Sequence, residues 1–287
     1  MKENQHHHLQ PIAVFAAFRS SLCLLFLLLA PAFVEAQTVK MSQSFYDNET
    51  LNYDIYFKWG VIMPRAGEAS LTMNTTRYNG SSAWIYRLLF RTTGIVERAY
   101  RMRDTIDTWM TPSYKMIYSS KRTDEGGYKL IDNLTFRFSG DKAYIHSYRR
   151  HLEKVKIDTT LVSDDNVYDI LASTLYLRGI DWDNIKSGDV FPFTVAIGRD
   201  LVKIHFRYSG KETFDRGSYR FVTRHFYVDI FDKAFTQTKA AAEAWIGDDE
   251  NHIPVKIRAK LKIGAAEVYF RSGSNLRTAM SSRTAIQ

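Results

Sequence analysis

The chain has 287 residues, of which 45% are hydrophobic and 14% aromatic, and this composition excludes an intrinsically disordered protein. Lysine and arginine number 39 against 31 aspartates and glutamates, and the resulting net charge of +8 favours anionic partners such as lipid headgroups or acidic glycans. The alternative is that the charge is spread over the polar faces of many strands.

The first 36 residues are expected to form a cleaved export signal. Lys2 and Arg19 supply positive charge before the apolar run 22–30, and residues 34–36 offer small side chains for cleavage before Gln37. The apolar run is too short to span a bilayer well, and no later segment is apolar enough to do so. We therefore expect a mature chain without a transmembrane span.

The only cysteine, Cys23, lies inside the apolar run of the signal rather than after it, which argues against lipidation. The mature chain is then free of cysteine, so a disulfide, a thiolate nucleophile and a thiolate metal site are excluded. Nucleic acid is not an expected partner of an exported protein.

Most of the chain after residue 48 shows the alternation of strands. Leu51, Tyr53 and Ile55 point to one side of the first strand, with polar residues between them. Asn79-Gly80 predicts a two-residue hairpin turn, and further strands with short turns follow to residue 160 and again from residue 190.

One segment has helical spacing instead. Residues 164–178 are predicted to form a helix, with Ser163 or Asp164 at its start and Gly179 at its end. The stripe that this helix would bury consists of Val167, Ile170, Leu171, Thr174, Leu175 and Arg178.

More than ten strands with one inserted helix cannot remain a flat open sheet. We predict an all-β, mainly antiparallel fold in which a large curled sheet, barrel-like or spiral-like, is wrapped around one central α-helix at about 164–178. Neither a repeat nor a linker divides the chain. A single β-rich domain is therefore expected over 37–271, followed by a flexible C-terminal tail over 272–287.

Three stretches carry a resemblance to a known family: 45–53 with 66–69, 169–178 with 187–189, and 244–255 with 262–264. Together they resemble a periplasmic family of Gram-negative bacteria, the domain of unknown function numbered thirty-one-oh-eight. The resemblance covers nearly all of the mature chain and implies an exported β-rich protein of the periplasm, similar in general shape to lipoprotein carriers and envelope-integrity proteins. It implies no enzymatic activity and no cofactor.

Two sets of residues are candidates for binding. The first would line the core or a ligand cavity, and consists of Trp59, Trp84, Ile170, Leu171, Thr174, Leu175 and Trp245. The second would contact an anionic surface, unless its charges are simply solvated at a turn, and consists of Arg149, Arg150, Lys154 and Lys156.

No catalytic residue, cofactor site or metal site is predicted. Asp104 and Asp107 are expected on opposite faces of a strand, where they would form salt bridges with nearby arginines rather than an acid–base pair. The acidic run 247–251 has hard oxygen donors that suit calcium, but it lacks spaced ligands, so a hairpin turn explains it better.

Three functions remain open. The preferred hypothesis is a non-enzymatic periplasmic protein that binds a lipid or another amphiphile of the envelope, or scaffolds an envelope protein. The second is a hydrolase of envelope glycan or lipid, which would bring Asp104, Asp107, Asp248 and Asp249 into one cleft. The third is a purely structural interaction module.

Overall fold

The computed structural model describes residues 46–231, 238–261 and 264–286, and all structural statements below concern these residues. The part of the chain from Gln37 onward forms one compact unit. The expected signal segment, 1–36, lies outside the described residues.

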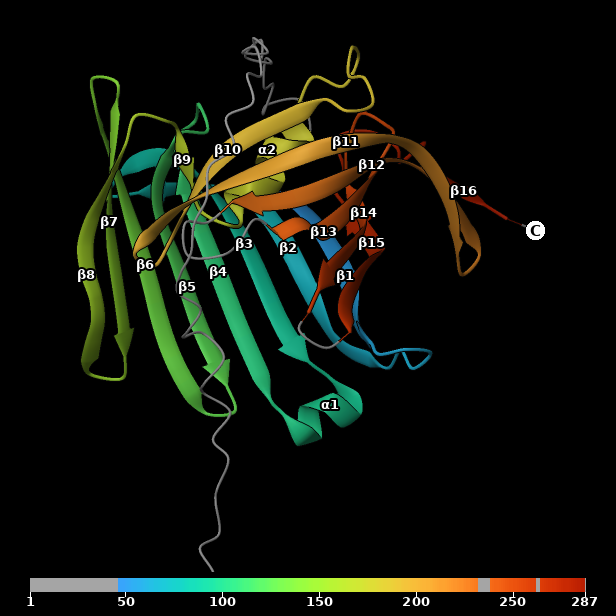
Figure 1. The fold of residues 1–287 in the computed structure, drawn as a ribbon, viewed down its shortest axis with the longest axis horizontal. Helices are drawn as coiled ribbons and strands as arrows, with labels where there is room; N and C mark the ends of the chain where they lie inside the picture. The colour runs from blue at the N-terminus through green and yellow to red at the C-terminus, as the bar shows by residue number, and fades with distance from the viewer. Residues whose placement is uncertain (1–45, 232–237, 262–263, 287) are drawn as a thin grey trace, which may run out of the picture. The chain divides into compact units, whose positions relative to one another are not determined.

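The described chain consists of strands and two short helices (Figure 1). Its first half comprises β1 (Glu49–Lys58), β2 (Arg65–Tyr78), β3 (Ser81–Thr92), α1 (Gly94–Ala99), β4 (Met102–Met110), β5 (Met116–Glu125), β6 (Tyr128–Ser139), β7 (Lys142–His151) and β8 (Lys154–Ser163). Its second half comprises β9 (Val167–Tyr168), α2 (Ala172–Gly179), β10 (Val190–Ile197), β11 (Asp200–Arg216), β12 (Tyr219–Phe231), β13 (Thr238–Gly247), β14 (Pro254–Lys260), β15 (Ala265–Ser274) and β16 (Arg283–Ala285).

All of these strands belong to one sheet. Its order is β8-β7-β6-β5-β4-β3-β2-β1-β15-β14-β13-β12-β11-β10-β9, and β16 adds to β12. Every pairing is antiparallel except the short parallel one between β9 and β10. The prediction of an all-β, mainly antiparallel fold is confirmed.

The two ends of the strand order approach each other, so the sheet is nearly closed and barrel-like. The turn between β10 and β11 lies against β7 and β8, where the Ser147 hydroxyl donates to the Gly198 carbonyl at 2.6 Å. The Arg199 guanidinium donates to the Lys156 carbonyl of β8 at 2.9 Å. These contacts cover part of an edge that would otherwise offer free backbone groups to another chain.

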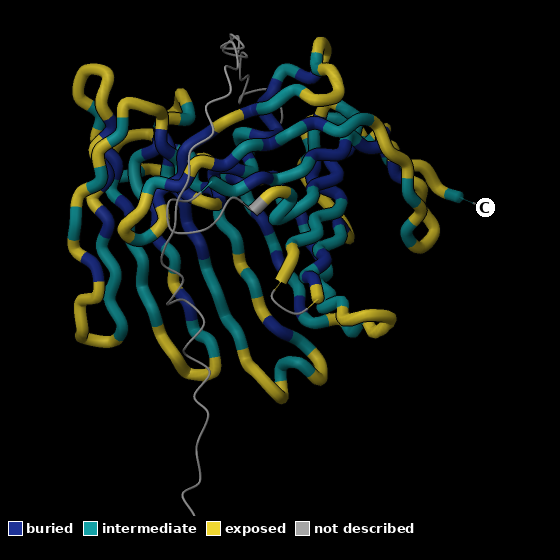
Figure 2. The backbone as a smooth tube through the Cα atoms, in the orientation of Figure 1, coloured by how far each residue is buried: buried dark blue, intermediate teal, exposed yellow. Residues whose placement is uncertain are grey.

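Alternation along each strand gives the sheet an apolar inner face. On β2, for example, Ala69, Leu71 and Met73 are buried, while Ser70 and Thr72 between them point to the other face. Figure 2 shows that burial is concentrated in the half of the sheet nearer α2, whereas the other half of β3 to β6 is largely intermediate. The inner face is therefore buried near α2 and becomes more accessible to solvent toward the other end of these strands.

The predicted helix is shorter than expected, and a sheet wrapped around it stays a prediction. Helix α2 begins at Ala172, not at 164, and Val167 and Tyr168 instead pair with Thr194 and Val195 of β10. Val167 is buried because of this strand pairing, so its helical spacing to the later residues is coincidental. Leu171 and Leu175 join the core formed with β1 to β7, and Leu177 joins a second core with β10 to β13.

Residues 272–286, expected as a loose tail, contact the sheet in the structure. Strand β15 continues to Ser274, and the Thr278 amide donates to the Asn251 side chain at 3.1 Å. Strand β16 then pairs with β12, Tyr219 lying opposite Ala285. The end of the chain is thus held by the β12 hairpin and by the turn between β13 and β14.

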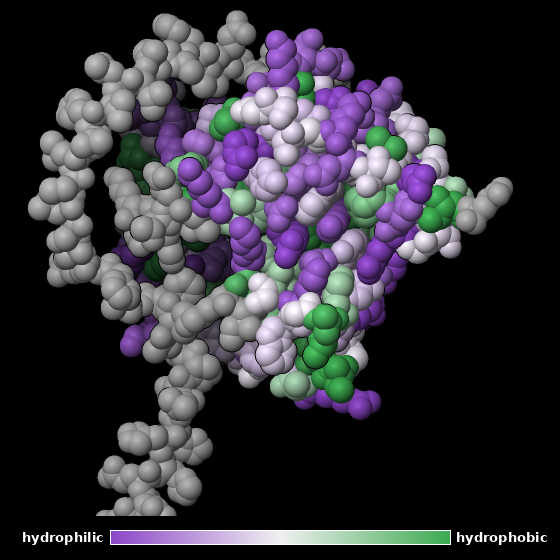
Figure 3. Space-filling view, turned by 45° about the vertical axis from the view of Figure 1, so that its right-hand side comes forward, coloured by the Kyte–Doolittle hydropathy of each residue, from purple (hydrophilic) through white to green (hydrophobic). Residues whose placement is uncertain are grey.

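No helix in the described ranges is long and apolar enough to cross a bilayer. On the face shown in Figure 3, hydrophobic and hydrophilic side chains alternate over most of the surface, and the strongest hydrophobic patch lies at its lower edge.

Candidate functional site

A buried ion pair fixes the end of α2. The Arg178 guanidinium donates to the two carboxylate oxygens of Glu49 at 2.7 and 2.8 Å, and to the Asn251 carbonyl at 3.0 Å. The side chains of Arg178 and Glu49 are 0% and 1% exposed. Burial by itself lowers the pKa of Arg178, but the Glu49 carboxylate outweighs this effect and raises it. The pair ties α2 to the start of β1 and to the turn between β13 and β14.

A buried carboxylate fixes the start of α2. Asp169 accepts a hydrogen bond from the Ala172 amide at 2.6 Å and so caps the first turn of the helix from outside, because Leu171 at the N-cap position makes no side-chain hydrogen bond. It also accepts hydrogen bonds from the hydroxyls of Thr108 on β4 and Ser119 on β5. Burial raises the pKa of Asp169, although the two hydroxyls oppose this. The start of the helix is thereby joined to the inner face of the sheet.

A pocket of about 150 Å³ lies next to this cap, between the inner face of the sheet and the turn from β10 to β11. Its lining residues are Ile106, Ser119, Lys121, Asp132, Leu134, Ser147, Arg149, Asp169, Ile170, Ala196, Ile197 and Gly198. We call it the concave pocket.

The sheet register explains why these residues meet. Ile106, Lys121, Asp132 and Arg149 lie opposite one another on β4 to β7 and form one cross-strand row on the inner face. The neighbouring row toward α2 contains Ser119, Leu134 and Ser147. The first row is mostly charged, whereas the second has small or apolar side chains. The pocket therefore lies at the boundary between a charged and an uncharged part of the inner face.

The apolar side of the concave pocket is open to solvent. Ile170 is 53% exposed and Ile197 is 41% exposed, although both lie beside the buried Leu134 and Ile106 in the pocket lining. Exposed branched aliphatic side chains around a concavity are typical of a site that receives an apolar group.

The charged side of the concave pocket carries two cations. Arg149 donates a hydrogen bond to Asp132, and the Lys121 ammonium lies 3.8 Å from the Asp104 carboxylate. The Lys121 side chain is 41% exposed and that of Arg149 is 31% exposed, so both still reach solvent. Burial raises the pKa of Asp104, with Lys121 opposing it.

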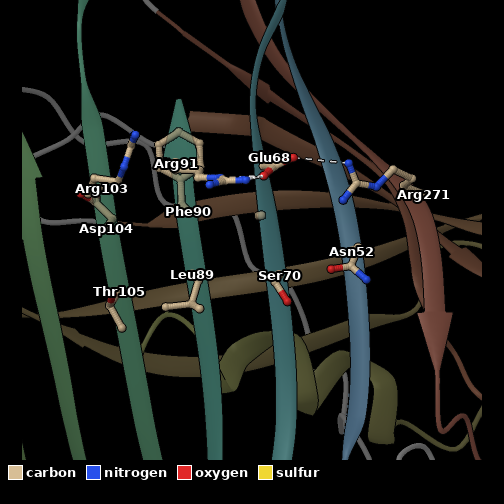
Figure 4. A pocket seen from close by; sticks show the side chains of 11 residues that line it. Asn52, Glu68, Ser70, Leu89, Phe90, Arg91, Arg103, Asp104, Thr105 and Arg271 are labelled. Carbon is tan, nitrogen blue, oxygen red and sulfur yellow. Dashed lines mark hydrogen bonds and ion pairs between the residues drawn. The ribbon is translucent and has the colours of Figure 1, made fainter. Parts of the chain in front are cut away.

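A second pocket, of about 440 Å³, lies on the opposite face of β1 to β4 (Figure 4). There Glu68 accepts hydrogen bonds from Arg91, from Arg65 at 3.0 Å and from Arg271 at 3.4 Å. The bond from Arg91 is the main cause of the lowered pKa of Glu68, although burial opposes it. Figure 4 shows Arg103, Arg91 and Glu68 on neighbouring strands, and Arg271, beyond the strand that carries Asn52, reaching toward Glu68. Because Arg65, Arg91 and Arg271 share the one Glu68 carboxylate, this outer pocket is best explained as a surface ion-pair network.

Two of the residues predicted to line the core or a ligand cavity are exposed: Trp59 lies outside the core, whereas Ile170 lines the concave pocket. Trp59 is 60% exposed because β1 ends before it, and its backbone pairs with Ile62 across a tight turn. Ile170 is 53% exposed because it lies in the connection before α2, where helical spacing does not apply.

The other five predicted core-lining residues are buried or partly buried. Leu171, Leu175 and Trp245 are 4%, 0% and 6% exposed, and Trp84 and Thr174 are intermediate. The Thr174 hydroxyl lies 3.3 Å from the Tyr86 hydroxyl, in the core beside α2. Among the seven candidates, Ile170 alone lines the concave pocket.

The predicted basic cluster is divided between two places. Arg149 lines the concave pocket, whereas the Arg150 guanidinium donates to the Leu152 carbonyl at 2.9 Å in the turn after β7. Lys154 and Lys156 are exposed on β8.

The four carboxylates of the hydrolase hypothesis do not converge. Asp104 faces the concave side, while Asp107 is buried on the other face between Arg87 and Arg122. Asp248 pairs with Arg224 at 2.7 Å. The Asp249 carboxylate accepts hydrogen bonds from main-chain amides around its own turn, including that of Asn251 at 3.0 Å. Within the described ranges, no group of three or more metal-ligating side chains is placed to hold an ion.

The sequence pattern missed Asp169 and the Glu49–Arg178 pair as organising residues. Arg178 gave a signal, since it lies in an apolar stripe at helical spacing, and a buried arginine needs a carboxylate partner. Glu49 gave none, because it is 129 residues away in the chain.

The sequence places the chain in a family whose function is not known. It belongs to the family described as "Protein of unknown function (DUF3108)", whose model matches residues 52–271. No curated protein matches the sequence.

A solved structure shares the fold. It is a β-barrel-like protein from Brucella abortus, of the domain of unknown function DUF1849, with a TM-score of 0.53 and 8% identity over 80% of this chain and 98% of that one. A protein of Parabacteroides distasonis, named a "putative lipoprotein", covers 83% of this chain and 100% of its own length at 7% identity, but with a TM-score of only 0.33. The first similarity supports the barrel-like fold alone.

Proposed function

We propose that this protein is a non-enzymatic, exported protein of the Gram-negative periplasm that binds an anionic amphiphile at the concave pocket. The apolar end of the ligand would lie against Ile170 and Ile197, and its anionic end would face Lys121 and Arg149. Export is supported by the signal-like pattern of the first 36 residues.

The observation that carries this proposal is the exposure of Ile170 and Ile197 beside two cations on the same face. Ile170 follows directly after Asp169, whose three hydrogen bonds hold it in place. Its exposure is therefore imposed by a rigid part of the fold. A pre-organised apolar surface binds at a lower entropic cost than one that must first be ordered.

The size of the pocket limits what it can enclose. Its volume of about 150 Å³ is below the roughly 300–1,000 Å³ that enclose a whole small molecule. It suits one end of an acyl chain, with the rest of the chain on the accessible half of the inner face. Each methylene that leaves water contributes about 0.8 kcal/mol, so contact with a few methylenes gives measurable affinity.

Calorimetric titration of the mature chain, residues 37–287, with dodecanoate tests the proposal. Ile170→Asn and Ile197→Asn are expected to weaken binding about tenfold each, which corresponds to about 1.4 kcal/mol. Lys121→Gln should weaken the binding of dodecanoate but not the binding of dodecanol, which has no carboxylate. Val162→Asn is the matched control, because Val162 is 49% exposed on β8 and does not line the pocket. Equal affinities for the control and the two isoleucine variants would refute the proposal.

A further inference from the structure

One end of the sheet carries a row of exposed apolar side chains on successive turns. The turns β14–β15, β1–β2, β5–β6 and β7–β8, together with the α1 connection between β3 and β4, all lie at this end because neighbouring strands alternate in direction. The exposed apolar residues on or next to these connections are Trp59, Val61, Ile62, Ile95, Tyr100, Tyr128, Leu152, Val155 and Leu261. We call this end the turn end.

The two most exposed apolar side chains, those of Val61 and Ile95, project from the turn end into solvent. Trp59 and Ile62 exchange backbone hydrogen bonds at 2.8 and 3.0 Å, which leaves Val61 at the tip of a tight turn with 102% exposure. Ile95 is 74% exposed on α1, whose start is joined to β2 by the hydrogen bond from the Thr93 amide to the Ala66 carbonyl. Neither of these apolar side chains is withdrawn into the core.

The connections at this end of the sheet also lie next to one another in space. A Cβ atom on Gly264 would lie 2.2 Å from the Lys58 carbonyl, so the β14–β15 turn abuts the end of β1. On the other side, the Gly126 amide donates to the Arg101 carbonyl at 2.7 Å and joins the β5–β6 turn to α1. The apolar tips therefore form one continuous margin of the sheet.

The opposite end of the sheet is different. Its turns at 79–80, 111–115, 140–141 and 248–253 are built mainly from small, polar and acidic residues, and the exposed apolar residues near this end, Tyr46, Tyr144, Val162 and Tyr219, lie beside the turns rather than at their tips. Isolated exposed apolar residues are normal on a protein surface, but a series of them on adjoining connections at one end is a candidate interaction surface.

Cations accompany the apolar margin. The exposed basic residues on or beside the same connections are Arg98, Arg101, Lys129, Lys154 and Lys260. Among the acidic residues nearby, Glu97 is hydrogen-bonded to Arg103 at 2.6 Å, whereas Glu153 is 99% exposed. The balance is basic, and a basic surface with apolar tips matches a bilayer that carries anionic headgroups.

We propose that the turn end docks on the surface of an anionic lipid bilayer, with Val61, Ile95 and Trp59 entering the interfacial region and the basic residues facing the headgroups. Figure 3 is turned about the vertical axis from Figure 1, so the turn end stays at the bottom, where hydrophobic surface lies beside strongly hydrophilic surface. Tryptophan and tyrosine suit this position, because their rings are stable at the interface between hydrocarbon and water. The proposal does not depend on what the concave pocket binds.

Vesicle flotation tests this docking surface. The mature chain should float with phosphatidylcholine vesicles that contain roughly a third of phosphatidylglycerol, and should not float with pure phosphatidylcholine. The double variant Val61→Asp with Ile95→Asp should lose at least tenfold in vesicle affinity, as should Arg98→Glu with Arg101→Glu. Both pairs are exposed, and circular dichroism would check that the variants fold.

Matched controls come from elsewhere on the sheet. Val162→Asp on β8 and Arg77→Glu at the opposite end of β2 place the same changes at exposed positions outside the turn end, and should bind vesicles as the unchanged chain does. Flotation of the Val61/Ile95 variant equal to that of the controls would overturn the proposal. It would equally be overturned if sedimentation velocity showed a dimer that this variant dissociates while vesicle binding is unchanged, since the turn end would then be a contact between two copies of the chain.

Discussion

Arg178 at the end of α2 and Glu49 at the beginning of β1 form an ion pair with both side chains closed to solvent, although 129 residues separate them in the chain. Each charge is tolerable only because the other is present, since an unpaired charge in the interior is strongly destabilising. This pair therefore determines where the end of α2 lies against the sheet.

Removing one member of the buried pair should be costly. We expect Arg178→Leu to lower the free energy of unfolding by about 3–5 kcal/mol, because Glu49 would be left buried without its partner. The double variant Glu49→Leu with Arg178→Leu should recover much of this loss. Urea denaturation followed by tryptophan fluorescence measures both.

The matched control for this pair is Arg220→Ala. Its pair with Asp215 has similar distances but is half exposed, at 53% and 46%, so a much smaller loss of stability is expected. If Arg178→Leu and Arg220→Ala had equal effects, burial would not be the source of the stabilisation.

Asp169 should matter through its hydrogen bonds. Asp169→Ala removes the cap of α2 and leaves the Thr108 and Ser119 hydroxyls without their acceptor, so a loss of about 2–4 kcal/mol is expected. Asp169→Asn keeps an acceptor for the cap and should cost less. Asp165→Ala, at a carboxylate that is 52% exposed, should change stability by less than about 1 kcal/mol, and thermal unfolding would rank the three variants.

Two neighbouring aspartates should respond to pH with opposite signs. Burial raises the pKa of Asp107, but hydrogen bonds from Arg87 and Arg122 outweigh it and lower the pKa overall. The stabilisation from this group is present above the unfolded pKa of about 3.9 and is lost as the pH falls through the native pKa. Asp107→Asn should therefore destabilise at neutral pH, and the difference should shrink in acid.

Asp104 should behave in the opposite way. Its pKa is raised by burial, so its favourable contribution is complete below about pH 3.9 and is lost as the pH rises through the native pKa. Asp104→Asn is then expected to stabilise at neutral pH and to be neutral in acid. Urea midpoints over a pH series would contradict this account if both variants shifted in the same direction.

The β14–β15 turn should tolerate no side chain at Gly264. Its φ is +76° and an added Cβ would meet the Lys58 carbonyl at 2.2 Å. Gly217 is the control position, because its φ is +57° and an added Cβ would have no atom within 4 Å. Gly217→Ala therefore measures only the cost of the backbone conformation, about 1 kcal/mol. Gly264→Ala should lose roughly 2 kcal/mol more than Gly217→Ala in urea denaturation. Equal losses would mean that this turn does not abut β1.

Local patterns predicted the strands well, because alternation depends only on neighbouring residues. Leu51 and Tyr53 are buried as their alternation indicated, and Asn79-Gly80 forms the expected tight turn, with φ of 48° and 84°. The same reasoning failed at Val167. This residue is buried, as a helix would have required, but the cause is its strand pairing with Thr194. A partner that lies far along the chain cannot be read from spacing.

The candidate site was less predictable than the fold for the same reason. Arg149 was singled out for its charge, but its role beside Ile170 depends on the register of β4 to β7 and on the approach of the β10–β11 turn. Ile197 had no signal, because an apolar residue at the end of a strand normally joins the core. It is exposed because it is the last residue of β10, where the strand enters the turn to β11.

The most direct test of amphiphile binding at the concave pocket is to map where a ligand is held. A dodecanoate analogue with a photoactivatable diazirine near its methyl end would be cross-linked to the mature chain, and the labelled peptides identified by mass spectrometry. We predict labelling of the segments that contain Leu134, Ile170 and Ile197, and its loss in Ile170→Asn. Labelling confined to the turn end or to the outer pocket around Glu68 would contradict the account.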